Sequence, residues 1–283
     1  MSRTYGRHRE RGKVVSKRIL LIDADILVYQ TACRAEKPID WGDGFWTLHS
    51  FEDEAVLDLE KRIASIKETL KGDELVFALT TTEKNFRKDV YPLYKSNRKE
   101  TRKPLVWKPL RDYLHANYTT FERPGLEGDD CLGILATKTW VGNPERILVS
   151  IDKDFKCIPC TYYNLDKGTT IEIDEYGADY WHMLQTLTGD ATDGYPGCPD
   201  IGPKTAEKIL KGVIEKVQEG MPNSPLTPYG KRLYMWDAVV NTYEKAGLSE
   251  AVALQMARCA RILRACDYDF TNKRPKLWEP PKA

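Results

Sequence analysis

The sequence predicts an α/β fold, with a mostly parallel central sheet and flanking helices, followed by a helical C-terminal subdomain. Three apolar runs are predicted to be buried strands, at residues 18–22, 75–79 and 147–151. Amphipathic segments separate them, and strands that alternate with helices are typical of a mostly parallel sheet. Strand signals fade beyond about residue 187, and helical segments follow.

The helices are predicted from apolar periodicity and the strands from short apolar runs. Residues 52–70 show the clearest helical pattern, because the apolar residues from Val56 to Leu70 fall on one stripe. Further helices are expected after residue 23 and at 126–139, 174–187, 203–218, 232–246 and 249–265. Short strands are expected at 45–48 and within 161–173, and surface loop with short helices at 84–111, which contains three prolines.

These elements divide the chain into three expected parts. Residues 1–17 are basic and lack apolar periodicity, so we expect a disordered tail. Residues 18–186 form the α/β domain and residues 187–283 the helical subdomain. The sequence contains no 18-residue apolar run, so we expect no transmembrane helix. The basic N-terminal segment is not followed by the apolar core of a secretory signal. Seven scattered cysteines fit a reducing, cytoplasmic compartment better than a disulfide framework.

The net charge of +1 conceals an uneven distribution. Residues 84–111 contain ten Lys or Arg and only two acids, with aromatic residues interleaved. Tyr94, for example, stands directly before Lys95. Aromatic rings can stack on unpaired bases while cations hold the backbone, which favours a nucleic-acid surface here. A solvated charged face is the alternative.

Acidic residues directly follow two of the predicted strands. Asp23 and Asp25 end the first strand, and Asp152 and Asp154 follow the third. In open α/β sheets, ligands bind beyond the carboxyl ends of the strands, so we expect these side chains to converge there. An Asp at a strand end can instead cap the next helix. Asp23 is the better candidate of the first pair.

Two further acidic motifs extend this pattern. One opens the helix predicted at 126–139, where capping is the alternative, and the other is a GDxxD motif that could be a helix end and turn. Oxygen-only clusters of such density suit Mg2+ or Mn2+, because close carboxylates need a cation among them. The predicted metal ligands are Asp23, Glu127, Asp129, Asp130, Asp152, Asp154, Asp190 and Asp193.

Residues 197–210 predict a phosphate-binding turn of the helix-hairpin-helix type. The sequence Ile201-Gly202-Pro203-Lys204 forms a Gly-rich turn that opens a helix. Amides at such a turn, aided by the helix dipole, can hold a phosphate oxygen, with Lys204 and Thr205 in support. These contacts would position the protein without reading bases. A simple loop before a helix is the alternative.

Together the motifs resemble the flap endonuclease/5′→3′ exonuclease superfamily of PIN-like 5′ nucleases, most closely the 5′→3′ exonucleases of short-tailed phages. The resemblance runs from about residue 18 to near the C-terminus. It implies a PIN/FEN-like domain followed by a helix-three-turn-helix subdomain, with the acidic motifs as the family's metal ligands. Lys95 and Arg98 match a segment in which a Lys and an Arg act on the scissile phosphate. Thr80 departs from the pattern, because most relatives carry an Asp there.

The resemblance implies a metal-dependent 5′→3′ exonuclease or 5′ flap endonuclease that hydrolyses DNA to 5′-phosphate products, and also RNA in hybrids. Two Mg2+ or Mn2+ ions, about 4 Å apart, would lie among the carboxylates, and a K+ ion at the hairpin turn. The implied catalytic residues are Lys95, Arg98, Asp23, Asp130 and Asp152. The implied DNA-binding residues are Tyr94, Lys95, Arg98, Arg87, Gly197, Ile201, Gly202, Lys204 and Thr205.

The expected partner is duplex DNA with a free 5′ end, a flap or a nick. We expect a monomer without membrane association, in the host cytoplasm if the chain is phage-encoded. Two other functions stay open at this point. A HAD-type phosphatase would account for Asp23, Asp25 and Thr80 but not for the basic stretch, and a non-catalytic DNA-binding module would not need the acids.

Overall fold

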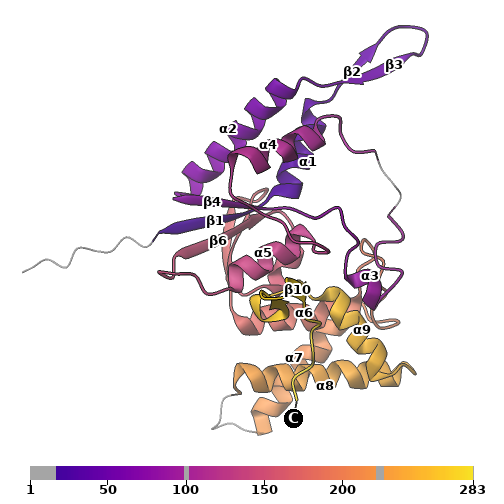
Figure 1. The fold of residues 1–283 in the computed structure, drawn as a ribbon. Coiled ribbons are helices and arrows are strands. Elements are labelled where there is room, and N and C mark those ends of the chain that lie inside the picture. Colours follow the sequence, from indigo (N-terminus) through magenta and orange to yellow (C-terminus); the bar gives the residue numbers. More distant parts are fainter. Residues whose placement is uncertain (1–16, 99–101, 221–225, 283) are drawn as a thin grey trace, which may run out of the picture.

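The computed structural model describes residues 17–98, 102–220 and 226–282. Of the tail expected at 1–17, only Lys17 lies within these ranges. A six-stranded sheet in the order β5-β4-β1-β6-β7-β8 forms the centre of the α/β body (Figure 1). Its strands are β1 (Arg18–Asp23), β4 (Glu74–Ala78), β5 (Thr120–Phe121), β6 (Glu145–Ser150), β7 (Cys160–Asn164) and β8 (Thr169–Ile173). All neighbours are parallel except β7 and β8, which confirms the mostly parallel sheet.

Both faces of the sheet are covered by helices. Alternate side chains of a strand point to opposite faces, so Leu20 and Ile22 pack into one apolar cluster and Ile19 and Leu21 into another. The first cluster contains α1 (Ala24–Ala35), α2 (Glu52–Leu70) and α4 (Trp107–Asn117). The second contains the 3-10 helix η1 (Lys153–Cys157) and α5 (Gly128–Thr137), and Figure 1 shows α5 on the other side of the sheet.

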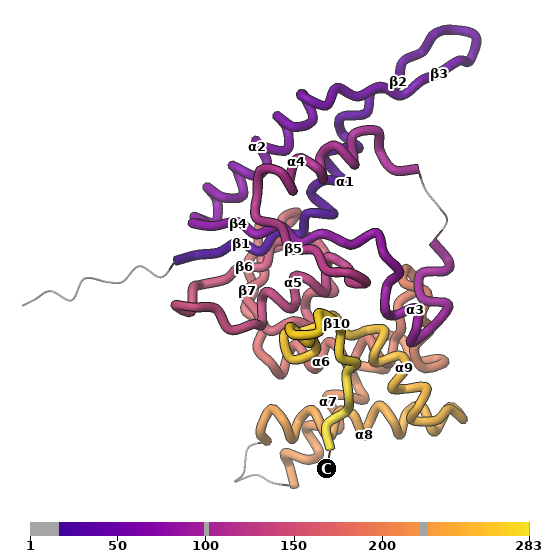
Figure 2. The backbone as a smooth tube through the Cα atoms, in the orientation of Figure 1, coloured from indigo at the N-terminus to yellow at the C-terminus, as the bar shows by residue number. Residues whose placement is uncertain are grey.

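A helical part follows the sheet in the chain. It consists of α6 (Glu175–Thr188), α7 (Pro203–Gly220), α8 (Pro228–Lys245) and α9 (Glu250–Ala260), which lie together below the α/β body in Figure 2. Met183 and Leu187 of α6 share one apolar cluster with Trp236 of α8 and Met256 of α9. The helical C-terminal region expected from the sequence is therefore present.

α6 packs on both sides of the expected boundary at residue 187. This helix, which the boundary assigns to the α/β domain, packs against α7, α8 and α9 and also against η1 of the α/β body. After α9 the chain returns to the α/β body, where Leu263 and Tyr268 join the cluster that contains α5. This return includes η2 (Ala265–Asp267), β9 (Tyr268–Asp269) and β10 (Arg274–Pro275). The two parts are therefore interleaved along the sequence.

Two elements lie outside this arrangement. β2 (Lys37–Asp40) and β3 (Trp46–His49) form an antiparallel hairpin that projects beyond α1 and α2 (Figures 1 and 2). The short helix α3 (Arg87–Val90) lies in the basic stretch and packs against α9. Among the described residues, no helix is long and apolar enough to cross a membrane.

Candidate active site

The carboxyl ends of β1 and β6 bring two predicted ligands together. β1 ends at Asp23, and Asp152 lies just beyond β6, the strand paired with β1. The Ser150 hydroxyl joins them, since it donates to Asp23 Oδ2 at 2.6 Å and accepts from the Asp152 amide at 3.1 Å. Asp23 Oδ1 also accepts from the amide of Ile26 at 3.2 Å, so it caps α1 as well. Nothing in the sequence singles out Ser150, because an uncharged residue at a strand end gives no signal.

The start of α5 brings Asp129 to the same place. Burial raises the pKa of Asp129 well above its usual range, and repulsion from Asp23, Glu127 and Asp152 adds to the effect. Burial also raises the pKa of Asp23 to about 7, with repulsion from Asp25 and Asp152 in the same direction. The position of α5 agrees, because the amide of Gly128, next to Asp129, donates to Thr80 Oγ1 at 2.8 Å, just beyond the end of β4. Residues far apart in the sequence therefore meet at one edge of the sheet.

Asp154 extends this group. Its amide donates to Asp152 Oδ1 at 2.8 Å, at the start of η1. Burial raises the pKa of Asp154 to about 7, and repulsion from Asp152 and Asp190 contributes. Its Oδ1 atom is buried without a hydrogen-bond partner in the described parts of the chain. We call Asp23, Asp129, Asp152 and Asp154 the acidic cluster.

Asp130 does not join the acidic cluster, which corrects its expected role as a metal ligand and catalytic residue. It is fully buried and accepts two hydrogen bonds of 2.7 Å from the guanidinium of Arg87. The amides of Leu263 and Glu127 also donate to it, at 3.1 and 3.2 Å. The last bond belongs to the capping box of α5. The helix register thus turns Asp130 away from the cluster while Asp129 faces it.

Arg87 and Tyr94 are structural residues and not the DNA contacts expected from the sequence. Both side chains are 2% exposed. Besides Asp130, the Arg87 guanidinium donates to the carbonyl oxygens of Cys259 and Arg261, at 3.1 and 2.5 Å. The Tyr94 hydroxyl lies within hydrogen-bond distance of Glu127 and Asp193, so its ring has no open face for a base. Sequence alone gives their charge and aromaticity but not their burial.

Lys95 and Arg98 lie beside the acidic cluster. They form ion pairs with two other predicted ligands, Glu127 and Asp193. Lys95 bonds to Glu127, and its ammonium lies 3.6 Å from Asp193 Oδ1. The Arg98 guanidinium lies 2.6 Å from the same oxygen. Although burial opposes it, Lys95 and Arg87 hold the pKa of Glu127 below its ordinary value.

The GDxxD motif forms a tight loop that carries Asp193 to these cations. Asp190 Oδ1 accepts from the amides of Thr192 and Asp193, at 2.7 and 3.0 Å, so Asp190 stabilises the turn. The Lys95 amide donates to the carbonyl of Asp193 at 2.7 Å. The Asn97 side chain donates to the carbonyl of Ala191 at 2.6 Å. Residues 94–98 are therefore attached to this loop by backbone as well as side-chain bonds.

The predicted phosphate-binding turn divides into exposed and buried residues. Gly202, Lys204 and Thr205 are exposed at the start of α7. Ile201 packs against the helical cluster. Gly197 is buried at a positive φ of 69°, and a Cβ there would lie 2.3 Å from the amide nitrogen of Gly189. Gly197 is therefore required by close packing and is not placed for DNA contact.

The carboxylates do not form a ready metal cage. Among the described residues, no three Asp, Glu, His or Cys side chains come close enough together to hold an ion. Internal partners explain this, because Asp23 is bonded to Ser150, Glu127 to Lys95 and Asp193 to Arg98. The donor set still fits a hard divalent cation. It consists of oxygen ligands, it carries excess buried negative charge, and one Asp154 oxygen is unpaired.

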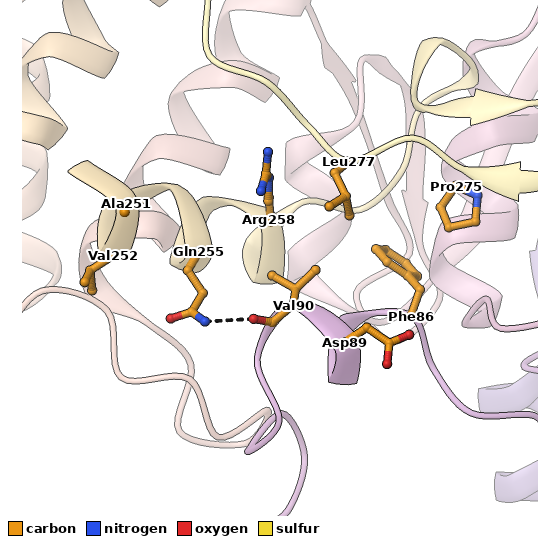
Figure 3. A pocket seen from close by; sticks show the side chains of 9 residues that line it. All are labelled: Phe86, Asp89, Val90, Ala251, Val252, Gln255, Arg258, Pro275 and Leu277. Atoms are coloured by element: carbon orange, nitrogen blue, oxygen red, sulfur yellow. Dashed lines mark hydrogen bonds between the residues drawn. The ribbon is translucent and has the colours of Figure 1, made fainter. Parts of the chain in front are cut away.

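A separate cavity of about 580 Å³ lies between α3, α9 and the C-terminal segment (Figure 3). The Gln255 amide crosses to the carbonyl of Val90 at 2.7 Å, at the end of α3. The cavity contains no residue of the acidic cluster. It is lined by Phe86, Asp89, Val90, Ala251, Val252, Gln255, Arg258, Pro275 and Leu277.

Solved structures of phage T5 proteins share the fold. One is a T5 5′-exonuclease with bound zinc, 15% identical, with a TM-score of 0.56 over 86% of this chain and 93% of that chain. Another is a bacteriophage T5 flap endonuclease in a complex with DNA and metal ions, 16% identical, with a TM-score of 0.53 over 85% of this chain and 99% of that one.

Sequence comparison identifies the family. Residues 18–177 match the family described as "5′-3′ exonuclease, N-terminal resolvase-like domain". The exodeoxyribonuclease of Enterobacteria phage T3 is 33% identical over 93% of both chains. The exonuclease of Escherichia phage T7 is 33% identical over 93% of this chain and 94% of its own. The chain therefore belongs to the 5′–3′ exonuclease family.

Proposed function

We propose that the protein is a metal-dependent 5′→3′ exonuclease and flap endonuclease that hydrolyses DNA phosphodiester bonds to 5′-phosphate products. Membership of a nuclease family supports the reaction class. The observation that carries the proposal is the convergence of Asp23, Asp129 and Asp152 at adjoining element ends, with raised pKa values at Asp23 and Asp129. Buried carboxylates that repel each other in this way fit a site completed by cations. HAD-type phosphatase chemistry and a purely DNA-binding role fit this family membership less well.

Asp23, Asp129, Asp152 and Asp154 are proposed to hold two divalent ions, Mg2+ or Mn2+, with Glu127, Asp190 and Asp193 at their edge. Bound ions would supply an activated water and neutralise the leaving oxygen. The chain's own residues prepare the place for them. Ser150 fixes the orientation of Asp23, and the Asp154 amide fixes Asp152. The unpaired Asp154 oxygen supports direct contact with a cation.

Lys95 and Arg98 are proposed to bind the scissile phosphate. Their present partners are carboxylates, for which a phosphate oxygen is a chemically equivalent acceptor. Lys95 has a positive φ of 54°, and its amide is bonded to the loop that carries Asp193. This attachment limits how far the side chains of Lys95 and Arg98 can lie from the carboxylates. They are therefore positioned to orient a phosphate and neutralise its charge.

DNA with a free 5′ end, a flap or a nick is the proposed substrate. The exposed Gly202, Lys204 and Thr205 at the start of α7 support a phosphate contact with duplex DNA, and the same turn would hold the K+ ion. Such contacts favour structure over sequence. RNA in hybrids, a monomeric state and action in the cytoplasm complete the proposal, and each follows from the family resemblance.

The test uses 5′-labelled duplex, nicked and flap DNA with Mg2+. We expect labelled products that carry a 5′ phosphate, no cleavage in EDTA, and loss of cleavage in Asp129→Asn with DNA binding retained. The exposed Asp166→Asn is the matched control and should cleave like the wild type. Rapid turnover of p-nitrophenyl phosphate with intact DNA would instead favour the phosphatase.

A further inference from the structure

We infer that the Thr80 hydroxyl is a positioning group that sets the divalent-cation affinity of the acidic cluster by fixing the start of α5. The inference rests on the proposed metal-dependent function. Thr80 lies two residues beyond β4, next to β1 in the sheet, and so at the edge where Asp23 lies. Its Oγ1 accepts from the amide of Gly128, the first residue of α5, at 2.8 Å.

This bond gives the Gly128 amide a hydrogen-bond acceptor that the helix itself does not provide. The first four amides of a helix have no intrahelical acceptor, and the capping box of α5 involves the amides of Glu127 and Asp130 but not that of Gly128. Thr80 supplies the acceptor from the loop that follows β4. The neighbouring amide of Thr81 donates to the carbonyl of Leu126 at 3.2 Å, so two bonds connect this turn to the start of α5.

The backbone of Thr80 is itself held on both sides. Its amide donates to Asp25 Oδ2 at 2.8 Å, and its carbonyl accepts from Arg111 at 2.9 Å. Arg111 also donates to Asp25 Oδ1 at 2.8 Å, which closes the ring of contacts. Because Asp25 binds both Arg111 and the Thr80 amide, it anchors this turn. The hydroxyl of Thr80 therefore has a fixed position from which to hold α5.

Gly128 shows how closely α5 approaches this anchor. A Cβ at that position would lie 2.8 Å from Asp25 Oδ2 and 3.4 Å from the Thr80 amide nitrogen. Glu127 and Asp129 flank Gly128 directly, and Asp129 faces the acidic cluster. A displacement of Gly128 must therefore move both carboxylates relative to Asp23. A hydroxyl provides the needed acceptor without adding another negative charge beside Asp25 and Asp129.

Replacement of the hydroxyl by a methyl group in Thr80→Val removes the acceptor at nearly constant volume. We expect the Mg2+ concentration for half-maximal cleavage to rise about fivefold to thirtyfold, the range for loss of one helix-capping bond. The cleavage rate at saturating Mg2+ should return to within about threefold of the wild type, because cations can draw α5 back into place. Thr80→Ser keeps the acceptor and should remain within about twofold of the wild type.

Two readouts test this. The first is the Mg2+ titration of flap cleavage, and the second is the rise in melting temperature that Mg2+ causes without DNA. The matched control is Thr81→Val, which loses a hydroxyl that bonds only the Glu83 amide among the described residues, at 3.3 Å. If Thr80→Val does not fold, Arg111→Lys replaces it, because Lys cannot reach both Asp25 and the Thr80 carbonyl.

A higher Mg2+ concentration for half-maximal cleavage and a smaller Mg2+-induced rise in melting temperature in Thr80→Val, both rescued by Thr80→Ser, support the inference. An unchanged Mg2+ titration overturns it, as does a loss of cleavage that saturating Mg2+ does not restore. Failure of the proposed function has a different signature, since wild-type protein would then show neither Mg2+-dependent cleavage nor a Mg2+-dependent melting temperature.

Discussion

The adjacent carboxylates of α5 should respond in opposite ways to the same substitution. Asp130 is buried with Arg87 and accepts four hydrogen bonds, whereas Asp129 faces other acids. Asp130→Asn leaves one acceptor oxygen and turns an amide donor toward the guanidinium. Loss of one partner of a buried ion pair costs about 3–5 kcal/mol. At about 2–4 °C per kcal/mol for a chain of this size, Tm should fall by about 6–20 °C.

Asp129→Asn should have the reverse effect on stability. The raised pKa of Asp129 means that its ionised form opposes folding, so a neutral amide should raise Tm at pH 8 in EDTA while it abolishes cleavage. Urea unfolding and differential scanning fluorimetry of both variants measure this, and cleavage of flap DNA at 10 °C separates activity from stability. A stable but inactive Asp130→Asn, together with an active Asp129→Asn, would refute our assignment of the two roles.

Three further outcomes follow from the site. In EDTA, Asp154→Asn should become more stable than the wild type as pH rises from about 4 to 7, because the folded-state pKa of Asp154 is raised to about 7. The difference in unfolding free energy should grow by no more than about 1.4 kcal/mol per pH unit. Equal urea-unfolding curves at pH 8 would contradict this. Lys95→Ala should lower kcat by about 10²–10³-fold in single-turnover cleavage, and a change in KM alone would disagree. Lys204→Ala should weaken duplex binding equally for all sequences and lower the slope of log Kd against log salt by about one in a fluorescence-anisotropy titration, whereas a sequence-dependent loss would argue for base contacts.

Much of the fold was predictable because its signals are local. The amphipathic stripe at 52–70 and the apolar run at 18–22 coincide with α2 and β1 within one residue. The two-residue strands β5, β9 and β10 are too short to give a periodic signal. The contacts of α6 with both the α/β body and the other C-terminal helices were not predictable, because a helical stripe does not reveal which neighbours cover it.

The site was predictable where it depends on strand ends. Asp23 and Asp152 converge because β1 and β6 are adjacent and parallel, which a buried apolar run suggests. The face of α5 was not predictable, because the capping box uses the same spacing, residues 127 and 130, that a shared metal face would use. The burial of Arg87 depends on Asp130 and on carbonyls more than 170 residues away, which no local pattern encodes.

The α/β body is completed by the segment that returns to it after α9. The Leu263 amide and the carbonyls of Cys259 and Arg261 complete the shell around Asp130 and Arg87. A fragment that stops before α7 would keep the entire sheet yet leave a guanidinium and a carboxylate in its interior with unfilled bonding capacity. The α/β body therefore depends on this last segment, and truncation, fusion or recombination at the junction would have to carry the segment along.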